Sequence, residues 1–215
     1  MATMNWARQE RHELADLFAE TGPDAPTLDE GWTTRDLAAH LVIRERRPDA
    51  AAGILVRPLA AYSEKVRLQV AAQPWGNLVE LVRSGPPRWS PTALEPVDRV
   101  ANTVEFFVHH EDVRRAQPGW EPRVVDGDRE RELWRRLKPM ARLLCRRAPV
   151  GLVLRRSNGD DAVAKKAGPD GRSATVTGPA SELLLFAFGR QAHARVDIAA
   201  SADDVAALTA ASLGL

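Results

Sequence analysis

The sequence predicts a mainly helical protein, an antiparallel helical bundle followed by a small α+β domain. Three observations support this fold class. Apolar residues recur at helical spacing through most of the first 147 residues, short loops with glycine or proline separate these segments, and β-branched runs bounded by turn signals begin only after Pro149. A chain of 215 residues is long enough for two domains, and we expect them to cover residues 1–147 and 148–215.

The predicted helices of the first domain follow one another with short connections, which favours antiparallel neighbours. The first stops at Gly22-Pro23 and the second at Pro48, because proline rarely continues a helix. A proline-rich connector precedes a long helix that opens near Pro96. The expected helical ranges are 5–22, 32–48, 59–72, 75–85, the long helix that includes 102–116, and 128–147.

The second domain is expected to mix strands and helices. Its β-branched runs are separated by the turn signals "SNGDD" and "GPDGR", and the apolar run "ELLLFAF" is typical of a buried helix. The expected order is a strand at 150–157, a strand at 173–178, a helix at 179–190, a strand at 194–200 and a helix at 201–213.

Composition excludes several function classes. Thirty basic residues against 29 acidic ones leave a formal charge of +1, which gives no electrostatic reason for a nucleic-acid or membrane-surface partner. The short helix pair around 31–41 could suggest a helix-turn-helix, but no basic recognition helix stands out, so a DNA-binding regulator is disfavoured.

Cysteine usage and the N-terminus indicate a cytoplasmic protein. Cys145 is the only cysteine, which excludes a disulfide framework and a cysteine-rich zinc site. Its neighbours are apolar and basic, so a buried inert thiol is a better interpretation than a nucleophile. The first 14 residues contain charges throughout and no apolar signal segment, and no run approaches the roughly 20 apolar residues that cross a bilayer.

The second predicted helix begins with a well-specified start. Thr33 as N-cap and Asp36 three residues later form a variant of the capping box. Trp32 and Leu37 occupy the positions of a hydrophobic staple. This start fixes the helix phase and directs His40 to the buried face. A single histidine there is more often a hydrogen-bonded core residue than a ligand, so His40 becomes a metal-ligand candidate only if partners exist elsewhere.

The long helix over 97–113 carries two polar groups separated by apolar residues. One group consists of Asp98, Asn102, Glu105, His109 and Asp112, and the other of Arg99, Thr103, His110 and Arg114. The group with arginines is the natural solvent face, so His110 is expected to point outward. The other group then turns toward the edge of the bundle interior, where an unpaired carboxylate is costly and needs a positively charged partner.

A metal ion is one such partner. Glu105 and His109 are four residues apart, so both side chains can reach one point above the same helix face. Carboxylate oxygen and imidazole nitrogen are ordinary ligands for zinc and similar divalent ions, and His40 would supply a third ligand from another helix. Three protein ligands leave a position for water or substrate, the pattern of a catalytic site. The alternative is that Glu105 and His109 pair with the plentiful arginines.

The combined motifs resemble a known family. "GWTTRDLAAHL", followed downstream by "TVEFFVHHEDV", resembles the DinB-like, mycothiol-dependent maleylpyruvate isomerase superfamily, and "TGPASELLLFAFGRQA" resembles that family's small second domain. The resemblance covers nearly the whole chain and implies a DinB-like antiparallel four-helix bundle with a small α+β C-terminal domain. It also implies that His40, Glu105 and His109 are metal ligands, with zinc as the ion, and that Arg190 is an active-site arginine.

The resemblance implies a mycothiol-dependent or otherwise thiol-dependent isomerase or S-transferase that acts on a small electrophile. No feature of the sequence identifies a maleylpyruvate pocket, and fold and ligands do not choose the reaction. The alternative is a non-catalytic metal- or ligand-binding bundle protein. For Arg190, a surface arginine that complements its helix dipole is an equal interpretation. Asp112 could orient a ligand imidazole, although a helix-surface acid is the preferred interpretation.

Overall fold

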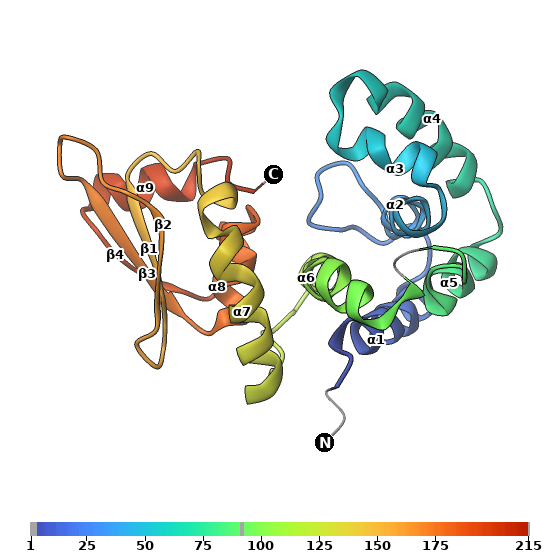
Figure 1. Cartoon of the computed structure of the whole chain (residues 1–215), viewed down its shortest axis with the longest axis horizontal. Coiled ribbons are helices and arrows are strands. Elements are labelled where there is room, and N and C mark those ends of the chain that lie inside the picture. Colours follow the sequence, from blue (N-terminus) through green and yellow to red (C-terminus); the bar gives the residue numbers. More distant parts are fainter. Residues whose placement is uncertain (1–3, 91–92, 215) are drawn as a thin grey trace. The chain divides into compact units, whose positions relative to one another are not determined.

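The computed structural model describes residues 4–90 and 93–214, and the chain forms two compact units, Met1–Glu121 and Pro122–Leu215 (Figure 1). The first unit is helical and the second contains a four-stranded sheet. This confirms the predicted class, a mainly helical chain with a small α+β part at its C-terminal end. Within the described helices, none is both long and apolar enough to cross a membrane.

The first unit contains six described α-helices, one more than the sequence predicts for this part of the chain. They are α1 (Trp6–Thr21), α2 (Thr34–Arg46), α3 (Pro48–Leu55), α4 (Ala60–Ala71), α5 (Trp75–Ser84) and α6 (Glu95–Arg114), with a 3₁₀ turn at Arg57–Leu59 between α3 and α4. The unexpected helix is α3. Proline lacks an N–H and fits the first turn of a helix, so Pro48 both ends the region of α2 and begins α3.

The core of this unit is built around α2. Its helix contacts α3, α4 and α5, while α1 packs against α5 and α6. The buried apolar cluster joins all of these surfaces, with Phe18 from α1, Leu37 and Ile43 from α2, Leu78 from α5 and Phe106 from α6. Phe106 lies between the two polar groups of α6 and is completely buried. Each polar group is therefore flanked by a buried surface, so neither can face open solvent along its whole length.

The second unit places two helices on a mixed sheet. The elements are α7 (Gly127–Leu144), β1 (Gly151–Arg156), β2 (Asp161–Lys165), β3 (Ser173–Gly178), α8 (Ala180–Ala187), a 3₁₀ turn (Gln191–His193), β4 (Asp197–Ala199) and α9 (Ala202–Thr209). The strand order is β2-β1-β3-β4, with β1 parallel to β3 and the outer pairs antiparallel. α7 and α8 pack against each other and against the sheet (Figure 1).

Two features of this unit differ from the sequence-based expectation. The predicted domain boundary lies between 147 and 148, after α7, whereas the structure divides the chain at 121, because α7 packs on α8 and β2. The strand β2 has no β-branched run, since its apolar residues are mainly alanine, and it forms through its pairing with β1. Cys145 is fully buried, as expected, and burial raises the pKa of its thiol to about 12, which disfavours the reactive thiolate.

The buried start of α2 should contribute strongly to stability. Leu37 is completely buried in the core cluster, whereas Leu68 on α4 is 54% exposed. We expect Leu37→Ala to lower the free energy of unfolding of the first unit by about 2–5 kcal/mol, because it leaves a cavity, and Leu68→Ala to change it by less than about 0.5 kcal/mol. Urea unfolding followed by circular dichroism measures both, and equal effects would contradict this packing.

Candidate metal centre

The start of α2 positions its histidine as the sequence predicts. The backbone N–H of Thr33 donates to Asp36 Oδ2 over 3.0 Å, and the Thr33 hydroxyl donates to the same oxygen over 2.8 Å. Trp32 packs against the core cluster that contains Leu37, as expected of a hydrophobic staple. One turn further, the ring of His40 lies 5.4 Å from the Trp32 ring, centroid to centroid, so the indole forms one wall beside it.

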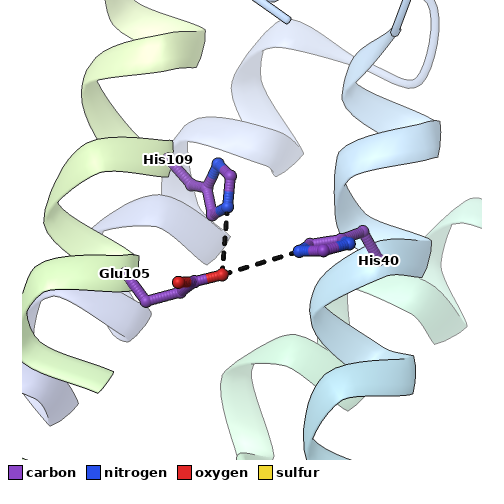
Figure 2. A group of neighbouring side chains, drawn as sticks. All are labelled: His40, Glu105 and His109. Carbon is purple, nitrogen blue, oxygen red and sulfur yellow. Dashed lines mark hydrogen bonds and ion pairs between the residues drawn. The ribbon is translucent and has the colours of Figure 1, made fainter. Parts of the chain in front are cut away.

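The structure brings the three predicted ligand side chains together. His40 from α2 and His109 from α6 both direct Nε2 toward the same carboxylate oxygen of Glu105 (Figure 2). Glu105 Oε1 lies 3.5 Å from His40 Nε2 and 3.2 Å from His109 Nε2. The three candidate ligand atoms all lie within 4.8 Å of one another.

This spacing fits a tetrahedral metal ion. With metal–ligand distances of about 2.1 Å, two ligand atoms of a tetrahedral site are about 3.4 Å apart. The two distances to Glu105 Oε1, 3.2 and 3.5 Å, have this value without any rearrangement. Two imidazoles and a carboxylate are also the donor types that zinc and other borderline divalent ions accept. The role of these residues as ligands stays a prediction, since the two distances to Glu105 Oε1 suit a hydrogen bond and an ion pair as well.

The electrostatics of the metal-free site are dominated by burial and by close charges. Burial opposes ionisation of Glu105, yet His109, His40 and Arg44 hold the pKa of this carboxyl well below its usual range. Burial also opposes charge on His109, but Asp112 and Glu105 raise the pKa of its ring to about 10. Burial lowers the pKa of His40, and Glu105 offsets this only in part. One histidine is therefore charged at neutral pH and the other is not.

Asp112 acts on the other side of the His109 ring. Its side chain is completely buried, and its Oδ2 lies 2.9 Å from His109 Nδ1, so the preferred interpretation as a helix-surface acid is wrong. Asp29 Oδ2 also lies 3.7 Å from the same nitrogen. Carboxylates at Nδ1 favour the tautomer that presents Nε2 as a metal ligand. Asp29 lies in the loop before α2, where no periodic signal could reveal it.

Arg44 is a site residue that the sequence analysis did not single out. Its Nε lies 3.1 Å from Glu105 Oε1, the oxygen that both histidines approach. Arg44 follows His40 by four residues, so the helical spacing that joined Glu105 to His109 also indicated it. The alternative of an arginine partner for Glu105 is thus true in part, since the carboxylate has histidine and arginine neighbours at once.

His110 does not face solvent, and that expectation is wrong. It is buried on the side of α6 that packs against α1, and its Nδ1 lies 2.8 Å from Glu10 Oε2. Thr103, from the same polar group, is buried as well. Glu10, Glu13 and His110 form a second group whose candidate ligand atoms lie within 4.8 Å of one another. The buried pair of Glu10 and His110 links α1 to α6. A projection of α6 alone cannot show this contact, because Glu10 lies on another helix.

Arg190 lies directly after α8 in the second unit. Its backbone N–H donates to the carbonyl of Leu185 over 2.9 Å, and its Nη1 donates to the carbonyl of Phe188 over 2.8 Å. These contacts hold both the backbone and the guanidinium of Arg190 at the C-terminal end of α8. Its predicted role in the active site stays a prediction.

Comparison with known proteins supports the fold. No protein-family model and no curated protein sequence matches the chain. Among solved structures, a mutant of the mycothiol-dependent maleylpyruvate isomerase with a histidine changed to alanine is similar at 14% identity with a TM-score of 0.61. A second structure of that isomerase is similar at 15% identity with a TM-score of 0.58. Each likeness covers 90% of both chains and shows a shared fold.

The charged state of His109 predicts a proton release. Its pKa is raised from 6.5 to about 10, so at pH 7.5 the ring is protonated and must lose its proton to bind zinc, whereas His40 is already neutral. We expect zinc binding to release about one proton, and the apparent affinity to rise about tenfold per pH unit up to about pH 10. Calorimetric titration in buffers with different ionisation enthalpies counts the protons. In Asp112→Asn the release should be smaller; binding heats that are independent of the buffer in the wild type would contradict this assignment.

Proposed function

We propose that the chain is a zinc-type metalloenzyme that uses a small thiol, such as mycothiol, either to isomerise a small electrophile or to transfer the thiol sulfur to it. The observation that carries the proposal is the convergence of His40, Glu105 and His109 at tetrahedral spacing. The shared fold with a mycothiol-dependent maleylpyruvate isomerase adds support. We propose further that the helical unit is a DinB-like four-helix bundle to which α3 and one further helix have been added.

The side chains would divide the work as follows. His40, Glu105 and His109 hold the metal, and Asp112 keeps the His109 tautomer that presents Nε2. A bound zinc ion lowers the pKa of a coordinated thiol or water. Arg190 would bind a carboxylate of substrate or thiol, a task suited to the guanidinium fork. A free thiol cofactor requires a reducing compartment, which agrees with the predicted cytoplasmic location.

The two candidate reactions differ in the fate of the thiol. In an isomerisation, the thiolate adds to a conjugated cis double bond, the resulting single bond rotates, and elimination returns the thiol unchanged. In an S-transfer, the thiolate displaces a leaving group or adds once, and the sulfur stays on the product. The alternative to both is a bundle that binds metal or ligand without catalysis, in which a fourth protein ligand would close the metal.

Metal content tests the first part of the proposal. Protein purified without chelators should contain about one zinc per chain, and His40→Ala and His109→Ala should each lose it, because two remaining ligands hold zinc weakly. His12→Ala is the matched control, since His12 is exposed on α1 and should leave the metal in place. Elemental analysis with circular dichroism decides the matter; a folded wild type that takes up no zinc, nickel or manganese would refute the site.

Thiol turnover tests the second part. The zinc-loaded protein is incubated with mycothiol and a panel of cis-alkenes conjugated to carbonyl groups, and with alkyl halides. An isomerase converts the alkene while the thiol concentration stays constant, whereas a transferase consumes one thiol per product. We expect Arg190→Gln to lower kcat/KM for carboxylate-bearing substrates at least about tenfold without loss of zinc. Zinc-loaded protein that accelerates none of these reactions would favour the non-catalytic alternative.

A further inference from the structure

The contacts of Arg44 with Glu105 and Asn102 hold it beside the candidate metal centre. Its Nε lies 3.1 Å from Glu105 Oε1, and its Nη1 donates to Asn102 Oδ1 over 2.7 Å. The guanidinium is planar, so two contacts at different nitrogens fix its orientation as well as its position. About a quarter of the side chain (23%) stays accessible to solvent, which leaves it within reach of a small ligand.

The contact with Asn102 does not depend on the metal site. Asn102 is buried, and its Nδ2 donates to Glu45 Oε1 over 3.1 Å and to Asp98 Oδ1 over 2.8 Å. Both carboxylates also accept from Arg11 Nη2, at 2.5 and 2.8 Å. Because these acceptors occupy the amide nitrogen, the amide oxygen is the atom that faces Arg44. A buried network therefore holds the guanidinium from behind.

Metal binding would change the other contact. His40 Nε2, His109 Nε2 and Arg44 Nε all approach one oxygen, Glu105 Oε1. A metal held by these histidines and this oxygen would use one of its lone pairs and weaken its attraction for Arg44. Asn102 would still hold the guanidinium close to the ion. A divalent ion and the Arg44 guanidinium together carry more positive charge than the single Glu105 carboxylate beside them can balance, so a further anion there is favoured. The side chain of Arg44 is 23% accessible to solvent, so a carboxylate of a small ligand can approach the guanidinium while Nη1 keeps its contact with Asn102.

We propose that Arg44 forms an anion subsite in the first unit, where it binds the carboxylate of the ligand that occupies the remaining coordination position of the metal. The inference rests on the metal-dependent function proposed above and adds the ligand class, a small carboxylate-bearing thiol or substrate. It places this charge recognition on α2, one helical turn after His40, independently of any contribution from Arg190.

The test uses the whole chain loaded with cobalt(II), whose absorption bands report ligands that enter the metal. Three probes are titrated: mercaptoacetate, which carries a thiol and a carboxylate, 2-mercaptoethanol, a neutral thiol, and succinate, a carboxylate without a thiol. The variants are Arg44→Gln and, as a matched loss of one positive charge, Arg8→Gln on the exposed side of α1.

We expect Arg44→Gln to retain cobalt and to weaken mercaptoacetate about tenfold, because a charge-assisted hydrogen bond is lost. Binding of 2-mercaptoethanol should change less than about twofold, and Arg8→Gln should match the wild type. For each probe, the affinity for the variant is compared with the affinity for the wild type. Chelation of cobalt by mercaptoacetate contributes to both values and so cancels. If Arg44→Gln also weakens the binding of succinate, the subsite accepts carboxylates of the substrate as well as of the thiol. If the binding of succinate does not change, the subsite accepts only the carboxylate of the thiol.

Two results separate this inference from the proposed function. If the wild type takes up no cobalt, the metal centre fails and the subsite fails with it. If cobalt binds but Arg44→Gln weakens mercaptoacetate and 2-mercaptoethanol equally, or neither, the metal centre stands and the anion subsite is overturned.

Discussion

The partial burial of the Glu105 carboxylate, whose side chain is 21% exposed, is the constraint on which the candidate site depends. A carboxylate taken out of water is unfavourable unless positive or hydrogen-bonding groups surround it. Three such groups converge on its Oε1, His40 and Arg44 from α2 and His109 from its own helix. The chain thus assembles a strongly polar centre between two helices, beside the apolar core cluster of the first unit. A divalent metal would satisfy the same carboxylate from the same position.

A second buried polar group supports the first. Hydrogen bonds link α1, α2 and α6 through Arg11, Glu45, Asp98 and Asn102. Asn102 in turn accepts a hydrogen bond from Arg44 and so fixes its position. Buried ion pairs add little net stability compared with apolar packing, because desolvation offsets their attraction. Their value here lies in geometry, since a fixed Asn102 fixes the guanidinium next to Glu105. The polar side of α6 therefore runs as one connected set of contacts from Asp98 to Asp112.

The sequence predicted those features that depend on local spacing. Thr33, Asp36 and the apolar period of α2 were enough to orient His40, and the four-residue spacing of Glu105 and His109 was enough to pair them. The predictions from sequence failed where contacts with a neighbouring element determine whether a residue is buried or a strand forms. His110 is buried because α1 supplies Glu10, Asp112 is buried beside His109 and Asp29, and β2 exists because β1 pairs with it. Helix α7 belongs to the second unit because it packs on α8. The composition of the segments on either side of α7 did not indicate this.

The most direct test of the central claim is the zinc K-edge X-ray absorption spectrum of the zinc-loaded protein, recorded with and without a small thiol. The account predicts a first shell of nitrogen and oxygen at about 2.0–2.1 Å, with the multiple scattering of two imidazoles, and a sulfur at about 2.3 Å after the thiol is added. A shell of oxygens without imidazole scattering would contradict the assignment of His40 and His109. A four-ligand shell that no thiol enters would contradict a thiol-dependent enzyme.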